Sequence, residues 1–168
     1  MRSGWRKGIH FWFILPGVGI ASFAISYFSH SGGSVTFEEP VGTDVAKGAA
    51  LYLEYCASCH GEELEGEVNW HTPKEDGTLP APPHDENGHT WHHGDDLLFN
   101  YTKLGGQVAL EAAGVSGFQS GMPGFADQLS DREIRDILSF IKSSWPEKIR
   151  EIQRQRTEGA TTTERAGN

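Results

Sequence analysis

CASCH (Cys56–His60) contains both cysteines of this 168-residue chain. The run before it, DVAKGAALYLEYC (44–56), is rich in helix formers. With Asp44 as its N-cap, we expect it to form a helix that carries the cysteine pair at its C-terminal end. Two thiols three positions apart lie on one face of such a helix, and an imidazole follows directly. Because the chain has no other cysteine, the pair must have a local use and cannot belong to a disulfide framework.

The CASCH spacing predicts the covalent attachment of one haem c. Each thiol can add to a vinyl group of the haem, while His60 turns under the ring and binds the iron through neutral Nε2. Three other uses of the pair stay open: a redox-active dithiol, a zinc site completed by histidines of the 84–93 loop, and a disulfide between Cys56 and Cys59. A redox dithiol is expected at a helix N-terminus that follows a strand, whereas here a helical pattern precedes the cysteines.

Met122 is the predicted second axial ligand, on the opposite face of the ring. It is the only methionine besides Met1, and it lies in the glycine-rich stretch GMPGF (121–125), which can approach the ring closely. A thioether opposite an imidazole raises the reduction potential. Core packing is the alternative role for a lone methionine. In that case a histidine of the 84–93 loop becomes the candidate ligand, and a lower potential is expected.

Two further stretches have helical patterns, and no run is typical of a strand. DDLLFNYTKL (95–104) has apolar residues on one face, as expected of a short amphipathic helix. In SDREIRDILSFIKSSW (130–145), apolar residues recur at helical intervals over a longer stretch. Its Ser130 and Glu133 have the spacing of a capping box. These two stretches are predicted to complete the helical core.

The stretches between and after these helices have loop composition. Residues 61–94 are rich in Gly, Pro, His and Asp, and a glycine-rich loop is expected from 105 to 127. Pro146 interrupts or kinks the preceding helix. Residues 147–168 are predicted to be a C-terminal extension, with one more surface helix and a disordered tail.

Together these features resemble a class I cytochrome c, in particular the membrane-anchored, single-haem type of bacteria. The resemblance rests on CASCHG (56–61), on GMPGF (121–125) and on LSDREIRDILSFIKSSW (129–145). It implies an all-α cytochrome c fold over residues 44–146, wrapped round one covalently bound haem, in which the first and last helices cross. At that crossing the resemblance implies contacts of Gly48 and Tyr52 with Phe140 and Ile141.

The resemblance also implies roles for a proline and a tryptophan near the ring. In this family a proline carbonyl accepts a hydrogen bond from Nδ1 of the proximal histidine, which fixes the tautomer of that histidine. Pro82, within APPH, is the best match, although His84 stands where an apolar residue is expected. Trp91, with Trp70 as a second candidate, is expected near the haem edge, where an indole N–H can donate to a propionate. Simple packing is the alternative for each tryptophan.

Residues 1–28 are predicted to be a membrane anchor or signal segment. Basic residues precede an uncharged run at 8–28, and a helix of that length spans about 31 Å, close to the hydrocarbon thickness of a bilayer. The alternative is a signal peptide cleaved near SFA (22–24). In both cases the positive-inside rule places the haem domain in the periplasm, at the bacterial inner membrane. Residues 29–43 are small and polar, as in a flexible linker.

The charge balance limits the partners of the chain. The formal net charge is −9, and from Glu38 to Asp136 there are 19 acidic residues against five basic ones, which argues against nucleic acid as a partner. With both axial positions filled and no nucleophile beside a base, we expect an electron-transfer protein and no enzyme. The predicted function is a membrane-tethered one-electron carrier between a quinol-oxidising complex and a terminal oxidase or dehydrogenase, with salt-dependent docking to basic patches.

Two other functions stay open. The chain could be a fixed haem c subunit of a multisubunit oxidoreductase, with residues 147–156 as a docking helix. It could also be a haem or metal sensor or a metal-binding module, because four imidazoles within ten residues can hold copper or zinc. Those imidazoles belong to His84, His89, His92 and His93. Solvated loop histidines are the simpler interpretation of the same pattern.

Overall fold

The computed structural model describes residues 42–166, with side chains up to residue 160, and it contains no strand in that range. The helices are α1 (Val45–Tyr55), α2 (Ala57–His60), the 3-10 helix η1 (Thr90–His92), α3 (Asp95–Leu104), α4 (Gly106–Ala112), α5 (Asp131–Ser143) and α6 (Glu147–Ala166). Within this range no helix is both long and apolar enough to cross a bilayer. The segment predicted as an anchor, 1–28, and the linker up to residue 41 lie outside the described residues.

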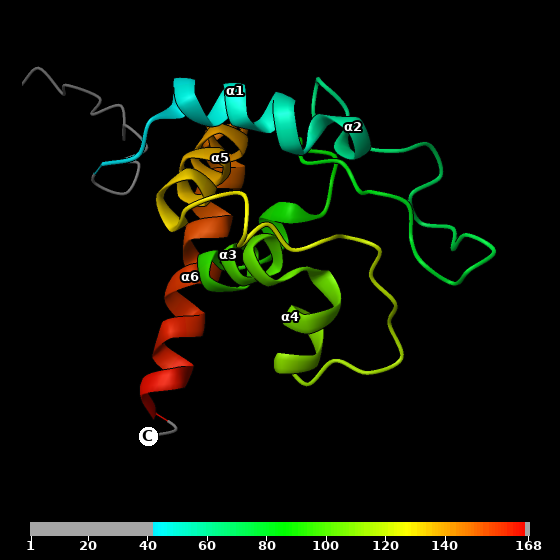
Figure 1. Ribbon diagram of the computed structural model, residues 1–168. Coiled ribbons are helices and arrows are strands. Elements are labelled where there is room, and N and C mark those ends of the chain that lie inside the picture. The colour runs from blue at the N-terminus through cyan, green and yellow to red at the C-terminus, as the bar shows by residue number, and fades with distance from the viewer. Residues whose placement is uncertain (1–41, 167–168) are drawn as a thin grey trace, which may run out of the picture. The chain divides into compact units, whose positions relative to one another are not determined.

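The first and the fifth helix pack directly against each other (Figure 1). At their contact Gly48 is buried, and a Cβ there would lie 2.0 Å from the carbonyl oxygen of Asp136. Only glycine permits this approach of the two backbones. The backbone nearest to Gly48 is that of Asp136 and Ile137, about one turn of α5 before the predicted Phe140 and Ile141. The other expected contact is present, since the ring of Tyr52 lies 5.4 Å from that of Phe140.

The N-terminus of α5 has the predicted capping box. The side chain of Ser130 accepts from the backbone N–H of Glu133, and the carboxylate of Glu133 accepts from the backbone N–H of Ser130. Lys47 of α1 forms an ion pair with the same carboxylate at 3.1 Å. The cap therefore also joins the two crossing helices, and behind it α5 buries four apolar side chains: Ile134, Ile137, Leu138 and Ile141.

The glycine-rich loop predicted for 105–127 is wrong in its first part, because α4 occupies Gly106–Ala112. Gly105, with a φ of 89°, ends α3 and lets the chain turn into the new helix. The residues that follow, QVALEA (107–112), are good helix formers, so the two glycines separate two helices and do not start a loop. The stretch from 113 to 130 contains no helix.

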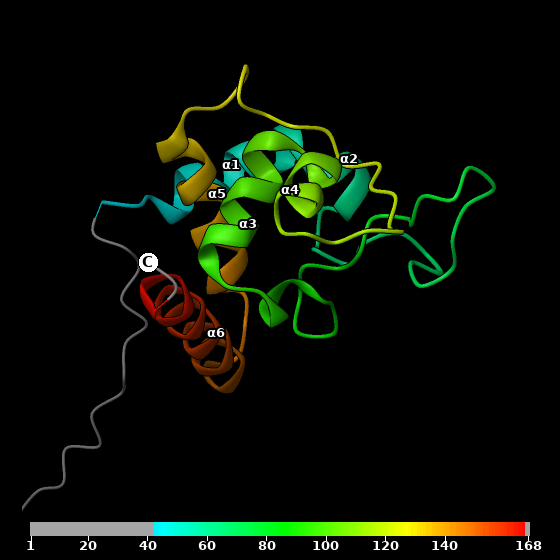
Figure 2. The same ribbon diagram turned by 90° about the horizontal axis from the view of Figure 1, so that it is seen from below.

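The C-terminal extension forms one helix, α6, which reaches Ala166. The predicted surface helix is present, but the disordered tail predicted after it is wrong as far as residue 166. Glutamate–arginine pairs three residues apart support its first half: Glu147 with Arg150, and Glu151 with Arg154. The side chain of Gln153 is 2% exposed. It donates to the carbonyl of His93 at 3.2 Å and to the carboxylate of Asp95 at 2.6 Å, so α6 is fixed to η1 and to the start of α3 (Figure 2).

Candidate functional site

The cysteine pair lies where α1 passes into the single turn of α2. Cys56 caps α1 through a bond from its N–H to the carbonyl of Tyr52, and its own carbonyl accepts from the N–H groups of Cys59 and His60. Both cysteines are free thiols; Cys56 is buried and Cys59 is exposed. Burial, and then the nearby Cys59, raise the pKa of Cys56 to about 11. This is the opposite of the lowered pKa that a redox-active dithiol needs.

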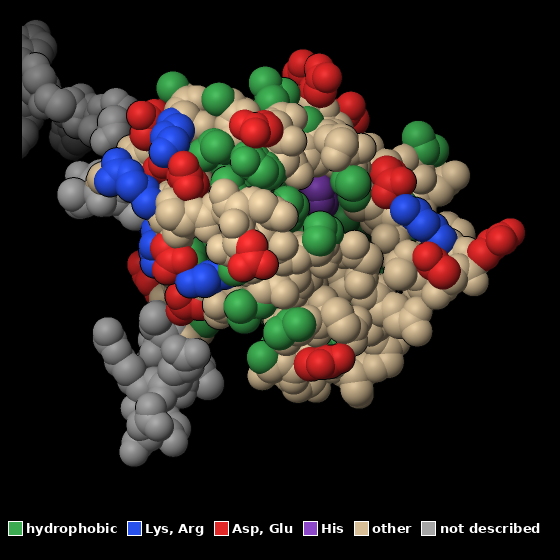
Figure 3. Space-filling model, in the orientation of Figure 1, with side chains coloured by type: hydrophobic (Ala, Val, Ile, Leu, Met, Phe, Trp, Pro, Cys, Tyr) green, Lys and Arg blue, Asp and Glu red, His purple; other side chains and the backbone are tan. Residues whose placement is uncertain are grey.

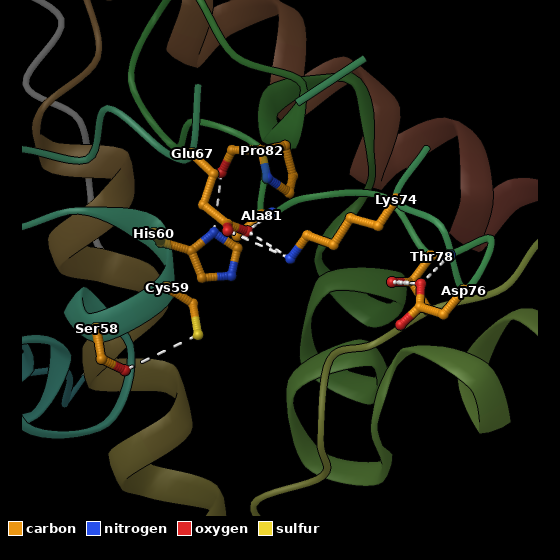
Figure 4. Close-up of polar contacts among 9 residues, drawn as sticks. All are labelled: Ser58, Cys59, His60, Glu67, Lys74, Asp76, Thr78, Ala81 and Pro82. Carbon is orange, nitrogen blue, oxygen red and sulfur yellow. Dashed lines mark hydrogen bonds and ion pairs between the residues drawn. The ribbon is translucent and has the colours of Figure 1, made fainter. Parts of the chain in front are cut away.

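His60 has its ring fixed by one carbonyl. Its Nδ1 lies 2.9 Å from the carbonyl oxygen of Pro82, and because a carbonyl only accepts, Nδ1 carries the proton. Nε2 therefore has a free lone pair, and among the residues described it has no hydrogen-bond partner. Figure 4 shows this second nitrogen facing away from Pro82, on the side where the sulfur of Cys59 lies. The ring is 7% exposed, and burial lowers the pKa of His60.

Glu67 helps to hold the Pro82 carbonyl in position. The sequence analysis did not predict this role for Glu67. The Glu67 carboxylate accepts from the backbone N–H of Ala81 at 2.6 Å, and the Glu67 N–H donates to the Ala81 carbonyl at 2.8 Å (Figure 4). The bond from Ala81, followed by Lys74, lowers the pKa of Glu67 and keeps it ionised. A single glutamate in a long loop has no sequence signal of its own for such a role.

His84 lies against the ring of His60. The two ring centroids are 4.0 Å apart and the planes are 20° from parallel. His84 also bonds through Nδ1 to the hydroxyl of Thr90 at 2.6 Å, and its carbonyl accepts from the indole N–H of Trp145 at 2.6 Å. Burial, and then the proximity of His60, lower the pKa of His84 well below its usual range, so this ring is neutral. The second axial ligand has to approach the haem from the face away from His60. Because the ring of His84 stacks on that of His60, His84 is not placed to be this ligand.

Met122 lies in the loop between α4 and α5, and its backbone fixes this loop to the junction of α3 and α4. Its carbonyl accepts from the N–H of Gly106 at 3.0 Å, and its N–H donates to the hydroxyl of Ser120 at 3.3 Å. The residue is half-buried. The structure brings the cysteines, His60 and Pro82 together. Met122 lies on a separate segment, and no polar contact joins it to Cys56 or His60 in the described part of the chain.

The two candidate tryptophans have partners of their own. The indole N–H of Trp91 donates to the carbonyl of Glu86 at 3.2 Å, and its ring stacks on His92 at 3.7 Å. The ring of Trp70 lies 3.5 Å from that of His71. In this arrangement the N–H of Trp91 is bonded to the backbone of its own loop, whereas the sequence suggested a propionate.

Comparison with known proteins agrees with the arrangement of Cys56, Cys59 and His60. The family model described as cytochrome c matches residues 45–145. The chain belongs to the cytochrome c family. Over 119 residues this cytochrome c is 30% identical to the cytochrome c subunit of alcohol dehydrogenase (quinone) from Gluconobacter oxydans (strain 621H). The matched part is 67% of the present chain and 22% of that relative, so the chain spans about a fifth of the relative's length. No solved structure matches this cytochrome c.

The residues of this site fit a covalently bound haem c, which is the cofactor of the protein. Cys56 and Cys59 fit the attachment motif, and both thiols are free to form thioether bonds. His60 presents an unprotonated Nε2, which is the form that binds iron. The donors present are therefore of the kinds that haem c requires, and the protein is an electron carrier of this family.

Proposed function

We propose that this cytochrome c carries single electrons with a haem attached through Cys56 and Cys59 and ligated by His60 and Met122. When bound, haem c would supply a one-electron redox centre. The proposal rests on one observation: Nδ1 of His60 is bonded to the carbonyl of Pro82, while its Nε2 has no hydrogen-bond partner among the described residues and faces the side where the sulfur of Cys59 lies.

The residues behind His60 keep its ring in one orientation. The bond to Pro82 prevents the ring from turning and makes Nε2 more basic, as second-shell partners of ligand histidines generally do. Glu67 supports Pro82 through the backbone of Ala81, and His84 packs on the face of the ring. Because these contacts exist before any change of charge at the site, little rearrangement is needed when an electron arrives.

We further propose that residues 1–28 tether the domain to the periplasmic side of the inner membrane. The support is the uncharged run of 21 residues behind a basic N-terminus. The linker, 29–43, has a root-mean-square span of about 21 Å if it is flexible. Such a tether raises the effective concentration of the carrier at redox complexes of the same membrane.

The surface charge suggests what kind of partner the carrier meets. Acidic side chains are spread over the face in Figure 3, while hydrophobic side chains gather round a histidine near its middle. The stretch from Glu38 to Asp136 has 19 acidic and five basic residues. A basic patch on a quinol-oxidising complex, a terminal oxidase or a dehydrogenase would attract this surface, and added salt would weaken the encounter.

A second candidate function is a fixed haem c subunit of a dehydrogenase complex. The relative from Gluconobacter oxydans is named as such a subunit. In addition, α6 lies beyond the stretch matched by the family, and its length of 20 residues gives this chain a surface that the family fold does not require. A permanently bound partner could use that helix.

Expression in cells with an intact haem-attachment apparatus tests the main proposal. The expected product is coloured, has the mass of the polypeptide plus one haem, and titrates with a single one-electron midpoint. Membranes and soluble fractions are titrated separately, and the full-length chain is expected in the membranes. A colourless product with the bare polypeptide mass would refute the carrier function.

Mild detergent extraction separates the two candidates. A mobile carrier purifies alone, whereas a fixed subunit purifies with a dehydrogenase catalytic subunit in equimolar amount. A matched variant carries Lys148→Glu and Gln155→Glu on the exposed side of α6 and leaves the buried Gln153 in place. If α6 is the docking helix, this variant keeps its haem spectrum and loses the dehydrogenase.

A further inference from the structure

Two histidines of the loop before α3 direct ring nitrogens at each other. Nε2 of His89 lies 3.0 Å from Nε2 of His93. The ring that stacks on His60 is that of His84, and neither His89 nor His93 has a ring contact or hydrogen bond with His60 among the described residues. His89 is exposed and His93 is half-buried, which leaves the gap between the two nitrogens open to solutes from the surface.

The distance between these nitrogens suits a shared metal ion. Imidazole nitrogens bind Zn²⁺ at about 2.0–2.1 Å, so two of them at an angle of 90–109° lie about 2.8–3.4 Å apart. The observed 3.0 Å falls inside this interval. A hydrogen bond between the same atoms would also fit, but it requires the two rings to adopt opposite tautomers.

The backbone holds the two rings at this spacing. His89 precedes η1 and His93 follows it, so one 3-10 turn brings residues i and i+4 together. The N–H of His93 donates to the carbonyl of Thr90 at 3.2 Å, and the carbonyl of His93 accepts from Gln153 of α6 at 3.2 Å. Ligands fixed in this way lose little conformational entropy when they bind an ion.

The electrostatic surroundings keep both rings neutral. Burial, and then the nearby His92 and His71, lower the pKa of His89. Burial, the neighbouring histidines and finally Arg156 lower the pKa of His93. At neutral pH both rings therefore have lone pairs to offer. The positive charge of Arg156 opposes a bound cation, so weaker binding is expected than at a site without it.

We infer that His89 and His93 chelate one divalent transition-metal ion of the kind that imidazole prefers, Cu²⁺ or Zn²⁺. No group of three or more His, Cys, Asp or Glu residues between 42 and 160 is arranged to hold a metal, so the pair supplies two ligands and water fills the other positions. The site uses none of the residues assigned to the haem, and it gives the carrier a second, surface-bound metal.

Calorimetric titration of the oxidised, haem-loaded protein with Zn²⁺, which is redox-inert, tests the inference. We expect one ion per chain. His89→Gln and His93→Gln should each weaken the affinity by at least about tenfold, as the loss of one of two ligands predicts. His92→Gln is the matched control, because it lies on the same turn and stacks on His89, whereas the short nitrogen–nitrogen contact joins His89 to His93. It should change the affinity by less than about twofold.

Two outcomes would overturn the site: the absence of stoichiometric Zn²⁺ binding, or an equal loss of affinity in His92→Gln and in the two ligand variants. The visible haem spectrum is recorded for every variant, and an unchanged spectrum shows that the fold is intact. Because the spectrum and the Zn²⁺ titration are separate readouts, failure of the metal site leaves the proposed electron transfer untouched.

Discussion

The imidazole ring of His84 stacks on that of His60 with the centroids 4.0 Å apart. A second polar ring thus lies directly behind the candidate iron ligand, at a position where the family resemblance suggests an apolar side chain. His84 has polar partners for its ring and for its backbone, Thr90 and Trp145 among them. Because its ring is neutral, is hydrogen-bonded to Thr90 and packs on His60, His84 can occupy the position of a hydrophobic residue.

His84→Leu tests whether the bond to Thr90 makes this ring acceptable there. The variant leaves the buried hydroxyl of Thr90 without its partner, which should lower the free energy of unfolding by about 1–3 kcal/mol. Adding Thr90→Val should restore part of the loss, because replacing both polar partners by apolar groups can be nearly neutral. Denaturant unfolding of the oxidised haem protein measures both. If the losses of unfolding free energy in His84→Leu and Thr90→Val simply added in the double variant, the hydrogen bond between His84 and Thr90 would not explain why a histidine is tolerated here.

Gly48→Ala tests the crossing of α1 and α5. A Cβ at Gly48 would lie 2.0 Å from the Asp136 carbonyl, so the helices must separate, and we expect a loss of several kcal/mol in unfolding free energy or failure to fold. Gly159→Ala in α6 is the matched control, because a Cβ there meets no atom within 4 Å. This change should raise the free energy of unfolding by at most about 1 kcal/mol through the higher helix propensity of alanine. Thermal melts of both variants are compared. Equal melting temperatures for Gly48→Ala and the unchanged protein would contradict the close approach.

Met122→Leu tests the second axial ligand without changing the bulk of the side chain. If the thioether ligates, the variant loses the charge-transfer band of iron–methionine bonding in the oxidised protein, and its midpoint potential falls. If Met122 only packs, leucine fills the same space, and both the spectrum and the potential stay as they were. Redox titration with visible spectra distinguishes the two results, and Met122→Ala shows the effect of opening the space as well.

Glu133→Gln should have an effect that depends on pH. Hydrogen bonds from the backbone and side chain of Ser130, and then Lys47, lower the pKa of Glu133 from 4.5 to about 2 in the folded chain. Ionised Glu133 therefore stabilises the fold fully above pH 4.5, and this contribution is lost as the pH falls towards 2. The difference in melting temperature between the unchanged protein and the variant should be constant at neutral pH and shrink below 4.5. A difference that is the same at pH 7 and pH 3 would argue against the shift.

The helices that sequence could predict are those with their own local signals. Asp44 as N-cap, the capping box of Ser130 and Glu133, and a helix at 95–104 are confirmed. The last residue of the apolar face predicted for that helix, Leu104, is exposed. α4 was missed because two adjacent glycines suggest a loop, while the φ of 89° at Gly105 uses the first of them as a helix end.

The arrangement of the long loop could not be predicted, because distant residues determine it. The N–H of His84 donates to the carbonyl of Leu64, and the carbonyl of His84 accepts from Trp145, 61 positions later. Neither bond has a sequence pattern. For the candidate site, CASCH identifies the cysteines and the neighbouring imidazole, whereas Glu67 and the stacking of His84 emerge only from tertiary structure.

The bonds from Trp145 to His84 and from Gln153 to His93 also bear on the order in which the molecule is assembled. A ribosome completes CASCH long before it reaches either of these anchors. During that interval nothing from the C-terminal helices can hold the histidine loop in place. In a chain that has not yet folded, Cys56 is therefore accessible for haem attachment, whereas in the folded chain it is buried.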